Sequence, residues 1–324
     1  MSDRDDFIAQ LLGGPLTLRR REVARAVGIS LLSARKLWRA LGFPGVGDED
    51  LAFTGTDREA LDRVVGLVRN DLIDEETAIA CARALGQNTD RLVSWQIEAL
   101  MEHLATRSAG GVVEDPLKLI EQLTPELELL LVYSFRRQLA AAVSRLDESA
   151  EAEIALTVGF ADLVAYTRLS RRLPRRELSR LVQRFEGLAS DVVTTGGGRV
   201  VKTVGDEVLF IAPDPITGAV IALSISERMA VDDLVPDVRV GISHGPVLRS
   251  LGDVYGTTVN LASRLTALAQ PGTVVTDPET AKALQDQPDI VLVAQRRRLV
   301  RGFGQVQPLL VAPASGTSRL INVD

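Results

Sequence analysis

The spacing of apolar residues changes near residue 150, and this change constrains the fold more than any other feature. Before it, segments such as 57–69 and 75–85 place Ala, Leu, Val and Ile three or four positions apart. That spacing gives each helix one apolar stripe, which must pack against other helices. After it, the apolar stretch 154–160 has the composition of a β-strand, and predicted strands and helices then alternate. The chain therefore divides into a helical part and an α+β part.

We predict two domains, because 324 residues exceed the length of one ordinary domain. Residues 1–148 are predicted to form an all-α domain ending in a linker helix, and residues 149–324 an α+β domain on a central sheet. The predicted strands of the second domain are 154–161, a pair within 199–212 turning at Gly205 and Asp206, 237–243, 246–252, 273–276 and several from 290 to 311. Its predicted helices are a short one from Leu163, then 175–194, 216–230, 257–269 and 278–285.

Composition and charge argue against several classes of protein. No apolar run approaches the roughly 18 to 20 residues that cross a bilayer, and the N-terminus lacks the pattern of a secretory signal, so we expect a cytoplasmic protein. The first 150 residues carry 18 Lys and Arg against 24 Asp and Glu, and the remainder carries 19 of each. This balance argues against broad electrostatic adhesion to nucleic acid or to an anionic membrane. The single Cys81 is predicted to be a buried structural thiol.

Four short motifs in the second domain carry residues suited to chemistry. They are FADLVAYT at 160–167, KTVGDE at 202–207, DVYG at 253–256 and VNLASR at 259–264. Each motif lies at a predicted strand end or helix start, where polar side chains reach a sheet edge. Any one of them alone is a weak signal.

Asp162 and Asp206 are the first candidates for metal ligands. A strand that ends at Asp162 presents its carboxylate beside a helix start, where free amides favour phosphate oxygens. Asp206 lies at the turn of a predicted hairpin and is expected to stand beside Asp162. Two adjacent carboxylates repel each other unless cations neutralise them, and oxygen ligands suit Mg²⁺ or Mn²⁺. Glu207 is expected to point to the opposite face of its strand and is left out of the ligand set.

Together, in this order, the four motifs resemble the class III adenylate cyclases over about residues 150–312. The resemblance implies a ferredoxin-like catalytic domain that converts ATP to 3′,5′-cyclic AMP and pyrophosphate with two metal ions at Asp162 and Asp206. It further implies that Lys202 donates a hydrogen bond to adenine N1 and that Asp253 accepts one from the 6-amino group. The first domain is similar to the helical regulatory domain of some soluble bacterial cyclases.

The same resemblance assigns roles to residues of the VNLASR motif. Asn260 and Arg264 are four positions apart on a predicted helix, so they share a face. The resemblance implies that Asn260 positions the ribose, that Arg264 stabilises transition-state charge on the α-phosphate, and that the active sites lie at the interface of a homodimer. Arg249 and Arg301 are further candidates for contacting the triphosphate. We do not nominate a separate general base.

Other classes of function remain open at this stage. Residues 17–43 are similar to a helix-turn-helix, with Gly28 at the turn, and a DNA-binding regulator is the main rival; the acidic surroundings lead us to expect regulation of the catalytic domain instead. A GGDEF-like diguanylate cyclase is disfavoured, because the turn 204–208 lacks the first glycine and the phenylalanine of that motif. A guanylate-forming cyclase is disfavoured by Lys202 and Asp253.

Overall fold

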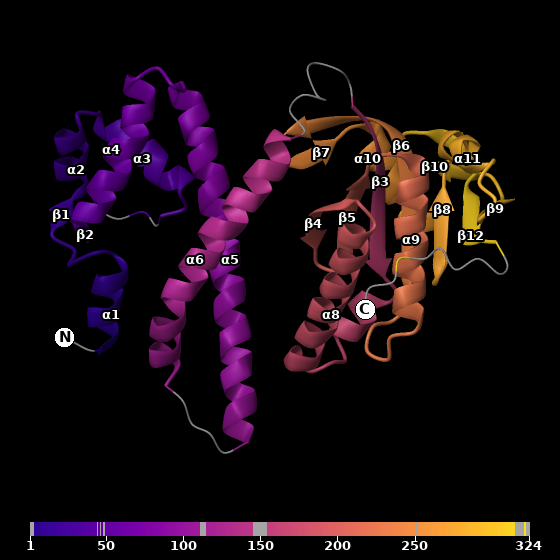
Figure 1. Cartoon of the computed structure of the whole chain (residues 1–324), viewed down its shortest axis with the longest axis horizontal. Helices are drawn as coiled ribbons and strands as arrows, with labels where there is room; N and C mark the ends of the chain where they lie inside the picture. The colour runs from indigo at the N-terminus through magenta and orange to yellow at the C-terminus, as the bar shows by residue number, and fades with distance from the viewer. Residues whose placement is uncertain are drawn as a thin grey trace. The chain divides into compact units, whose positions relative to one another are not determined.

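The chain folds into two units, residues 1–145 and residues 146–324, in a computed structural model (Figure 1). The structure describes residues 3–43, 45, 47, 49–110, 115–144, 154–250, 252–314 and 321. The predicted domain boundary, between residues 148 and 149, lies outside the described residues. Within the described ranges, no helix combines the length and the apolar character that crossing a membrane requires. The cytoplasmic location stays a prediction.

Helices dominate the first unit. Its elements are α1 (Asp3–Leu11), β1 (Leu18–Arg19), α2 (Arg20–Val27), α3 (Leu31–Ala40), β2 (Leu51–Phe53), α4 (Gly55–Arg69), α5 (Glu75–Ala109) and α6 (Pro116–Val143). The antiparallel ribbon of β1 and β2 was not expected from the sequence. Strands of two and three residues are too short to show a period of two, and they form only because the two segments meet in the fold.

The predicted helix pair within residues 17–43 is present as α2 and α3. The first helix ends at Gly28, whose φ of 78° lies in the left-handed region that glycine adopts without a Cβ penalty. The second helix is capped by Ser30, whose hydroxyl accepts a hydrogen bond from the Ser33 amide at 3.0 Å. The two helices meet in a core that includes the buried Val23 and Trp38.

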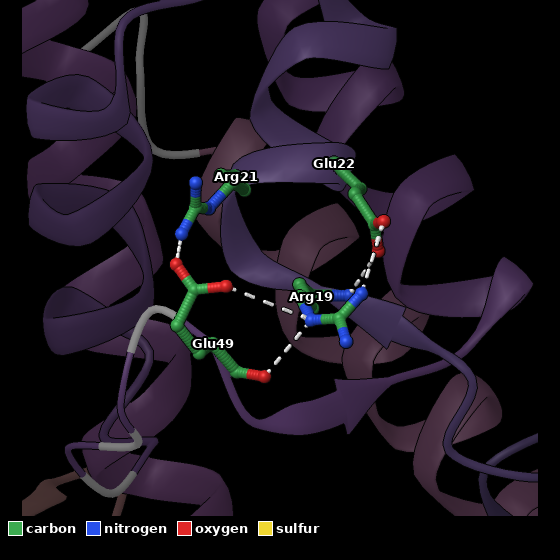
Figure 2. Close-up of polar contacts among 4 residues, drawn as sticks. All are labelled: Arg19, Arg21, Glu22 and Glu49. Carbon is green, nitrogen blue, oxygen red and sulfur yellow. Dashed lines mark hydrogen bonds and ion pairs between the residues drawn. The ribbon is translucent and has the colours of Figure 1, made fainter.

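Polar contacts join the start of α2 to the segment before β2, as Figure 2 shows. The Arg19 amide donates to the Glu22 carboxylate at 2.7 Å, while the Arg19 side chain donates to the Glu49 carbonyl at 3.0 Å. The Glu49 carboxylate also forms an ion pair with Arg21. These contacts hold the ribbon against α2.

The second unit is built on a mixed sheet with helices. Its elements are β3 (Ile154–Leu163), α7 (Tyr166–Ser170), α8 (Arg175–Thr195), β4 (Arg199–Val204), β5 (Glu207–Ala212), α9 (Pro215–Ala230), β6 (Val238–Ser250), β7 (Asp253–Tyr255), α10 (Thr257–Leu268), β8 (Thr273–Thr276), α11 (Pro278–Leu284), β9 (Ile290–Ala294), β10 (Arg298–Val300), β11 (Gly304–Val306) and β12 (Leu309–Pro313).

The sheet begins with a ferredoxin-like arrangement, which confirms the predicted fold class. Its strand order is β4-β5-β3-β6-β8-β12-β9, and β7 pairs with β6 outside this path. Each neighbouring pair among the first four strands is antiparallel, and α8 and α9 lie in the connections of the βαββαβ unit. Strand β8 then pairs with β6 in parallel.

The two faces of the sheet are covered by different helices. On β3, Ala161 and Leu163 pack with buried residues of α8 and α9, which lie along the sheet in Figure 1. Val158 and Phe160 alternate to the other face and pack with Ala262 of α10. Since side chains two positions apart share a face, Asp162 lies on the α10 side of the sheet.

Several predicted boundaries differ from the structure. Strand β3 continues through Asp162 to Leu163, because the carboxylate residue is still paired with both neighbouring strands. The strands predicted at 237–243 and 246–252 are one continuous strand, β6. Cys81 is exposed, so the prediction that it is buried was wrong. It lies on α5, whose neighbouring Ala82 occupies the packed side instead.

Candidate active site

Asp162 lies where β3 is paired on both sides. In the antiparallel pairing it stands opposite Glu207 of β5 and opposite Arg239 of β6. The Arg239 Nε atom donates a hydrogen bond to an Asp162 carboxylate oxygen at 2.6 Å. The Asp162 side chain is 13% exposed, so the guanidinium compensates a carboxylate that is largely removed from water.

Asp206 occupies the two-residue turn between β4 and β5, as predicted. Its carbonyl accepts a hydrogen bond from the Leu163 amide at 3.0 Å, which fastens the turn to the end of β3. Burial raises the pKa of the Asp162 carboxyl; Arg239 opposes this shift, and the Asp206 carboxylate adds to it. The two acids are therefore close enough to repel each other, as the sequence predicts for a cation site.

Glu207 lies on the same face as Asp162, so the expectation of opposite faces was wrong. The alternation argument fails because Asp206 belongs to the turn and not to the strand, and strand pairing places Glu207 directly across from Asp162. Burial, followed by repulsion from Asp162 and Asp206, raises the pKa of Glu207 to about 7. Within the part of the chain that the structure describes, no three acidic, His or Cys side chains form a cluster suited to holding a metal.

Lys202 and Asp253 meet across the gap between β4 and β7. The Lys202 ammonium donates to an Asp253 carboxylate oxygen in a part-buried ion pair. Burial acts to raise the pKa of Asp253, but the contact with Lys202 and the Val254 amide outweigh it and leave the pKa lowered. The sequence paired these residues only through a family resemblance, and the structure brings their side chains into direct contact.

Helix α10 presents Asn260 and Arg264 on one exposed face. Its opposite side is buried against β6 and β3, with Ala262 and Leu265 fully covered. The close approach of α10 to β6 depends on Gly241 of β6, since a Cβ there would lie 2.2 Å from the Thr266 amide nitrogen. The sheet therefore sets the direction in which the two polar side chains project.

Arg249 and Arg301 are both exposed and lie outside the contacts described so far. Arg249 is near the end of β6, opposite Val254 of β7, and Arg301 is in the turn between β10 and β11. Sequence reasoning missed Arg239 altogether. An arginine early in a strand carries no local signal, and only the pairing of β3 with β6 brings it to Asp162.

Known proteins resemble the chain over both units. Residues 149–311 match the family described as the adenylate and guanylate cyclase catalytic domain. An adenylate cyclase of Glutamicibacter nicotianae is 46% identical, over 97% of this chain and 83% of that protein. An adenylate cyclase of Streptomyces coelicolor is 40% identical, over 96% of this chain and 91% of that protein. The crystal structure of the adenylyl cyclase CyaB from P. aeruginosa aligns with a TM-score of 0.45 and 27% identity, over 52% of this chain and 97% of that chain.

Proposed function

The chain belongs to the adenylate and guanylate cyclase catalytic domain family, and on that premise we propose that it is a class III adenylate cyclase. It converts ATP to 3′,5′-cyclic AMP and pyrophosphate. The observation that carries this proposal is the ion pair of Lys202 with Asp253, on a sheet that also presents the neighbouring acids Asp162 and Asp206. A Lys and Asp pair offers one donor and one acceptor, which complement N1 and the 6-amino group of adenine.

The acidic pair fits divalent cations. Mg²⁺ is commonly bound by one or two carboxylates, with water and substrate phosphates as the other ligands, so a larger protein cluster is not required. We propose that Asp162 and Asp206 hold two Mg²⁺ or Mn²⁺ ions per site. When bound, such ions lower the pKa of the 3′-hydroxyl and neutralise the triphosphate. Burial raises the pKa of Asp162, and the hydrogen bond from Arg239 acts against this shift.

The remaining residues orient the nucleotide and stabilise charge. The ribose 3′-oxygen forms a bond to the α-phosphorus, the bond to pyrophosphate breaks in line, and the hydroxyl proton passes to water. Asn260 orients the ribose for this attack, and Arg264 meets the negative charge that grows on the α-phosphate in the transition state. Arg249 and Arg301, both exposed cations, are proposed to contact the leaving phosphates.

The active enzyme is proposed to be a homodimer with its sites between subunits. The exposed face of α10 supports this arrangement, because Asn260 and Arg264 point away from their own unit. Helix α6 also has no buried residue, and its large exposed apolar side chains suit a subunit contact. They are Leu129, Leu130, Leu131, Val132, Tyr133, Phe135, Leu139 and Val143.

Substrate choice tests the proposed activity. Purified protein with Mn²⁺ should release cyclic AMP and pyrophosphate from ATP, and it should turn over GTP roughly 100-fold more slowly, since a site built to pair with one base leaves its polar groups unpaired by the other. Asp253→Asn should reduce this preference, whereas Asp286→Asn, at an exposed acid of the same unit, should leave it unchanged. Equal turnover of both nucleotides, or a cyclic dinucleotide from GTP, would contradict the proposal.

Residues 1–148 are proposed to regulate catalysis. The chain passes from α6 to β3 through residues 145–153, so the predicted helix end near Asp147 lies outside the described residues. Removing residues 1–148 should change the specific activity several-fold, because the helices that contact the second subunit are lost. Initial rates of both chains across pH, with dimerisation checked by size, measure this effect. Identical rates from folded, dimeric chains would exclude a regulatory role.

A further inference from the structure

Positive charge is concentrated in one short part of the first unit. Residues 17–43 carry seven Arg and Lys residues and a single acid, Glu22, whereas the rest of the first 150 residues carries 11 basic against 23 acidic residues. The acidic balance of the whole half conceals this local basic segment. Charges separated by more than about 8 Å are largely screened at physiological salt, so the local excess decides what this surface attracts.

The same residues form a helix-turn-helix with one exposed stripe. Helices α2 and α3 are joined by residues 28–30, and α3 buries Ala34, Leu37 and Trp38 against α2 and the rest of its unit. Leu32, Lys36 and Arg39 follow one another at spacings of four and three, so they lie on a common face, and all three are exposed. Leu32 is 64% exposed and gives this face one apolar side chain.

The helix pair is also joined to neighbouring elements by side-chain contacts. The Arg20 guanidinium lies 5.8 Å from the ring centre of Trp38 on α3 and 6.0 Å from that of Phe53 on β2. The ion pairs of Figure 2 add a second link between α2 and the segment before β2. Arg19 and Arg21 are therefore paired with Glu49 within the first unit, and they are not among the side chains assigned to a ligand below.

We propose that this helix-turn-helix binds double-stranded DNA, with α3 as the helix that enters the major groove. A helix with its side chains is about 10 to 12 Å wide, which matches a groove about 12 Å wide. Lys36 and Arg39 contact phosphates or guanine, Leu32 contacts a thymine methyl group, and Arg25 of α2 contacts the backbone. Lys36 is 4.0 Å from Glu75 in an exposed pair, which is weak enough to give way to a phosphate.

This activity is separate from nucleotide cyclisation, because every residue involved belongs to the first unit. DNA is favoured over an acidic protein as the partner for two reasons. The exposed stripe of α3 combines two cations that are able to hydrogen-bond to bases with one apolar side chain, and α3 is the second helix of a helix-turn-helix, the helix that enters the major groove in such motifs. The binding is expected to discriminate between sequences.

The test is selection of binding sites by the full-length chain from random-sequence duplex DNA. A selected duplex should bind at least about 1,000-fold more tightly than a scrambled one, and its affinity should fall steeply between about 50 and 200 mM salt. Lys36→Ala with Arg39→Ala should weaken binding at least about tenfold, since each lost base or phosphate contact costs about that factor. The control pair Arg83→Ala with Arg91→Ala removes the same charge from exposed positions on α5 and should change affinity less than about twofold.

Circular dichroism and a second variant separate a fold defect from a binding defect. Lys36→Arg with Arg39→Lys keeps both charges and should retain salt-dependent binding even where base contacts are altered. The proposal is overturned if selection enriches no duplex, if the α5 control loses affinity as much as the α3 variant, or if an RNA duplex or single-stranded DNA of the same sequence binds as tightly.

Discussion

At the scale of single residues, the carboxylates around Asp162 repel one another, and the Arg239 guanidinium offsets part of this repulsion. Asp162 has an acid opposite it on one side and Arg239 on the other. Burial and the neighbouring acids raise the pKa values of Asp162 and Glu207, and the guanidinium works against both shifts. The cation proposed for this site would relieve the repulsion that remains after the contact with Arg239.

His244 is a partly buried titratable residue outside the proposed site, and we expect its protonation to affect the stability of the second unit. Burial lowers the pKa of His244 below its ordinary 6.5, although Asp214 and Asp277 oppose the shift. At His244 the unfolded chain therefore binds a proton more readily, so the contribution of this residue to the free energy of unfolding should fall as the pH drops below about 6.5, whereas the raised pKa of Glu207 contributes with the opposite sign. His244→Gln should remove the His244 contribution, so the difference between the variant and the wild type in urea unfolding should change between about pH 7 and pH 5.

The control for this experiment is His103→Gln, at an exposed histidine of the first unit, which should leave the slope of the second unit's unfolding unchanged. The hydrogen bond between His244 Nδ1 and the Thr157 hydroxyl, 3.0 Å long, is one that a glutamine amide is able to replace. Parallel pH profiles for the wild type and His244→Gln would show that another group controls acid stability.

At the scale of elements, the hairpin of β4 and β5 and the helix α10 carry most of the residues proposed for the active site. The hairpin supplies Lys202 at one strand and Asp206 at its turn. Helix α10 supplies Asn260 and Arg264 because its other side is seated on β6 and β3. Small shifts of α10 should therefore alter catalysis without touching any polar residue.

Two separate glycine substitutions test how closely α10 must approach the sheet. Gly241→Ala should destabilise the second unit by about 1 to 3 kcal/mol, because its Cβ would overlap the backbone of α10 at Thr266. Gly187→Ala is the matched control: nothing lies within 4 Å of its Cβ, and it sits inside α8, so it should stabilise by about 0.5 to 1 kcal/mol. Chemical unfolding of each variant measures both changes; a neutral Gly241→Ala would mean that α10 moves away at no cost.

At the scale of the whole molecule, the proposed shared site predicts complementation between two inactive variants. Asp162→Ala should abolish metal-dependent turnover, and Arg264→Ala should abolish it by removing charge stabilisation in the transition state. If the acids and Arg264 of one site come from different subunits, a mixed dimer contains one site with both defects and one intact site. Its activity should approach half that of the wild-type dimer.

The mixture must be measured after subunit exchange, which a size-tagged copy of one variant reveals. Homodimers of either variant are inactive, so they lower the activity of the mixture in proportion to the fraction of dimers that they form. Exchanged subunits that stay as inactive as the separate variants would refute the proposed division of the site, while leaving the roles of Asp162 and Arg264 within one subunit open to direct test.

Local patterns in the sequence determined most of the secondary structure. Strand β8 and the hairpin turn at Gly205 and Asp206 lie where predicted, because apolar spacing and turn chemistry act over a few neighbouring residues. The motif order also predicted the family. The neighbouring positions of Asp162 and Asp206 followed from one strand end and one turn.

Only the tertiary structure decided which side chains face one another. Arg239 reaches Asp162 across 77 positions of sequence, and Lys202 reaches Asp253 across 51. Glu207 faces Asp162 because of strand register, which depends on the pairing of two distant segments and is not encoded in the period of either one. The ribbon of β1 and β2 arises in the same way, since each strand is too short to be stable or recognisable until the fold brings its partner alongside.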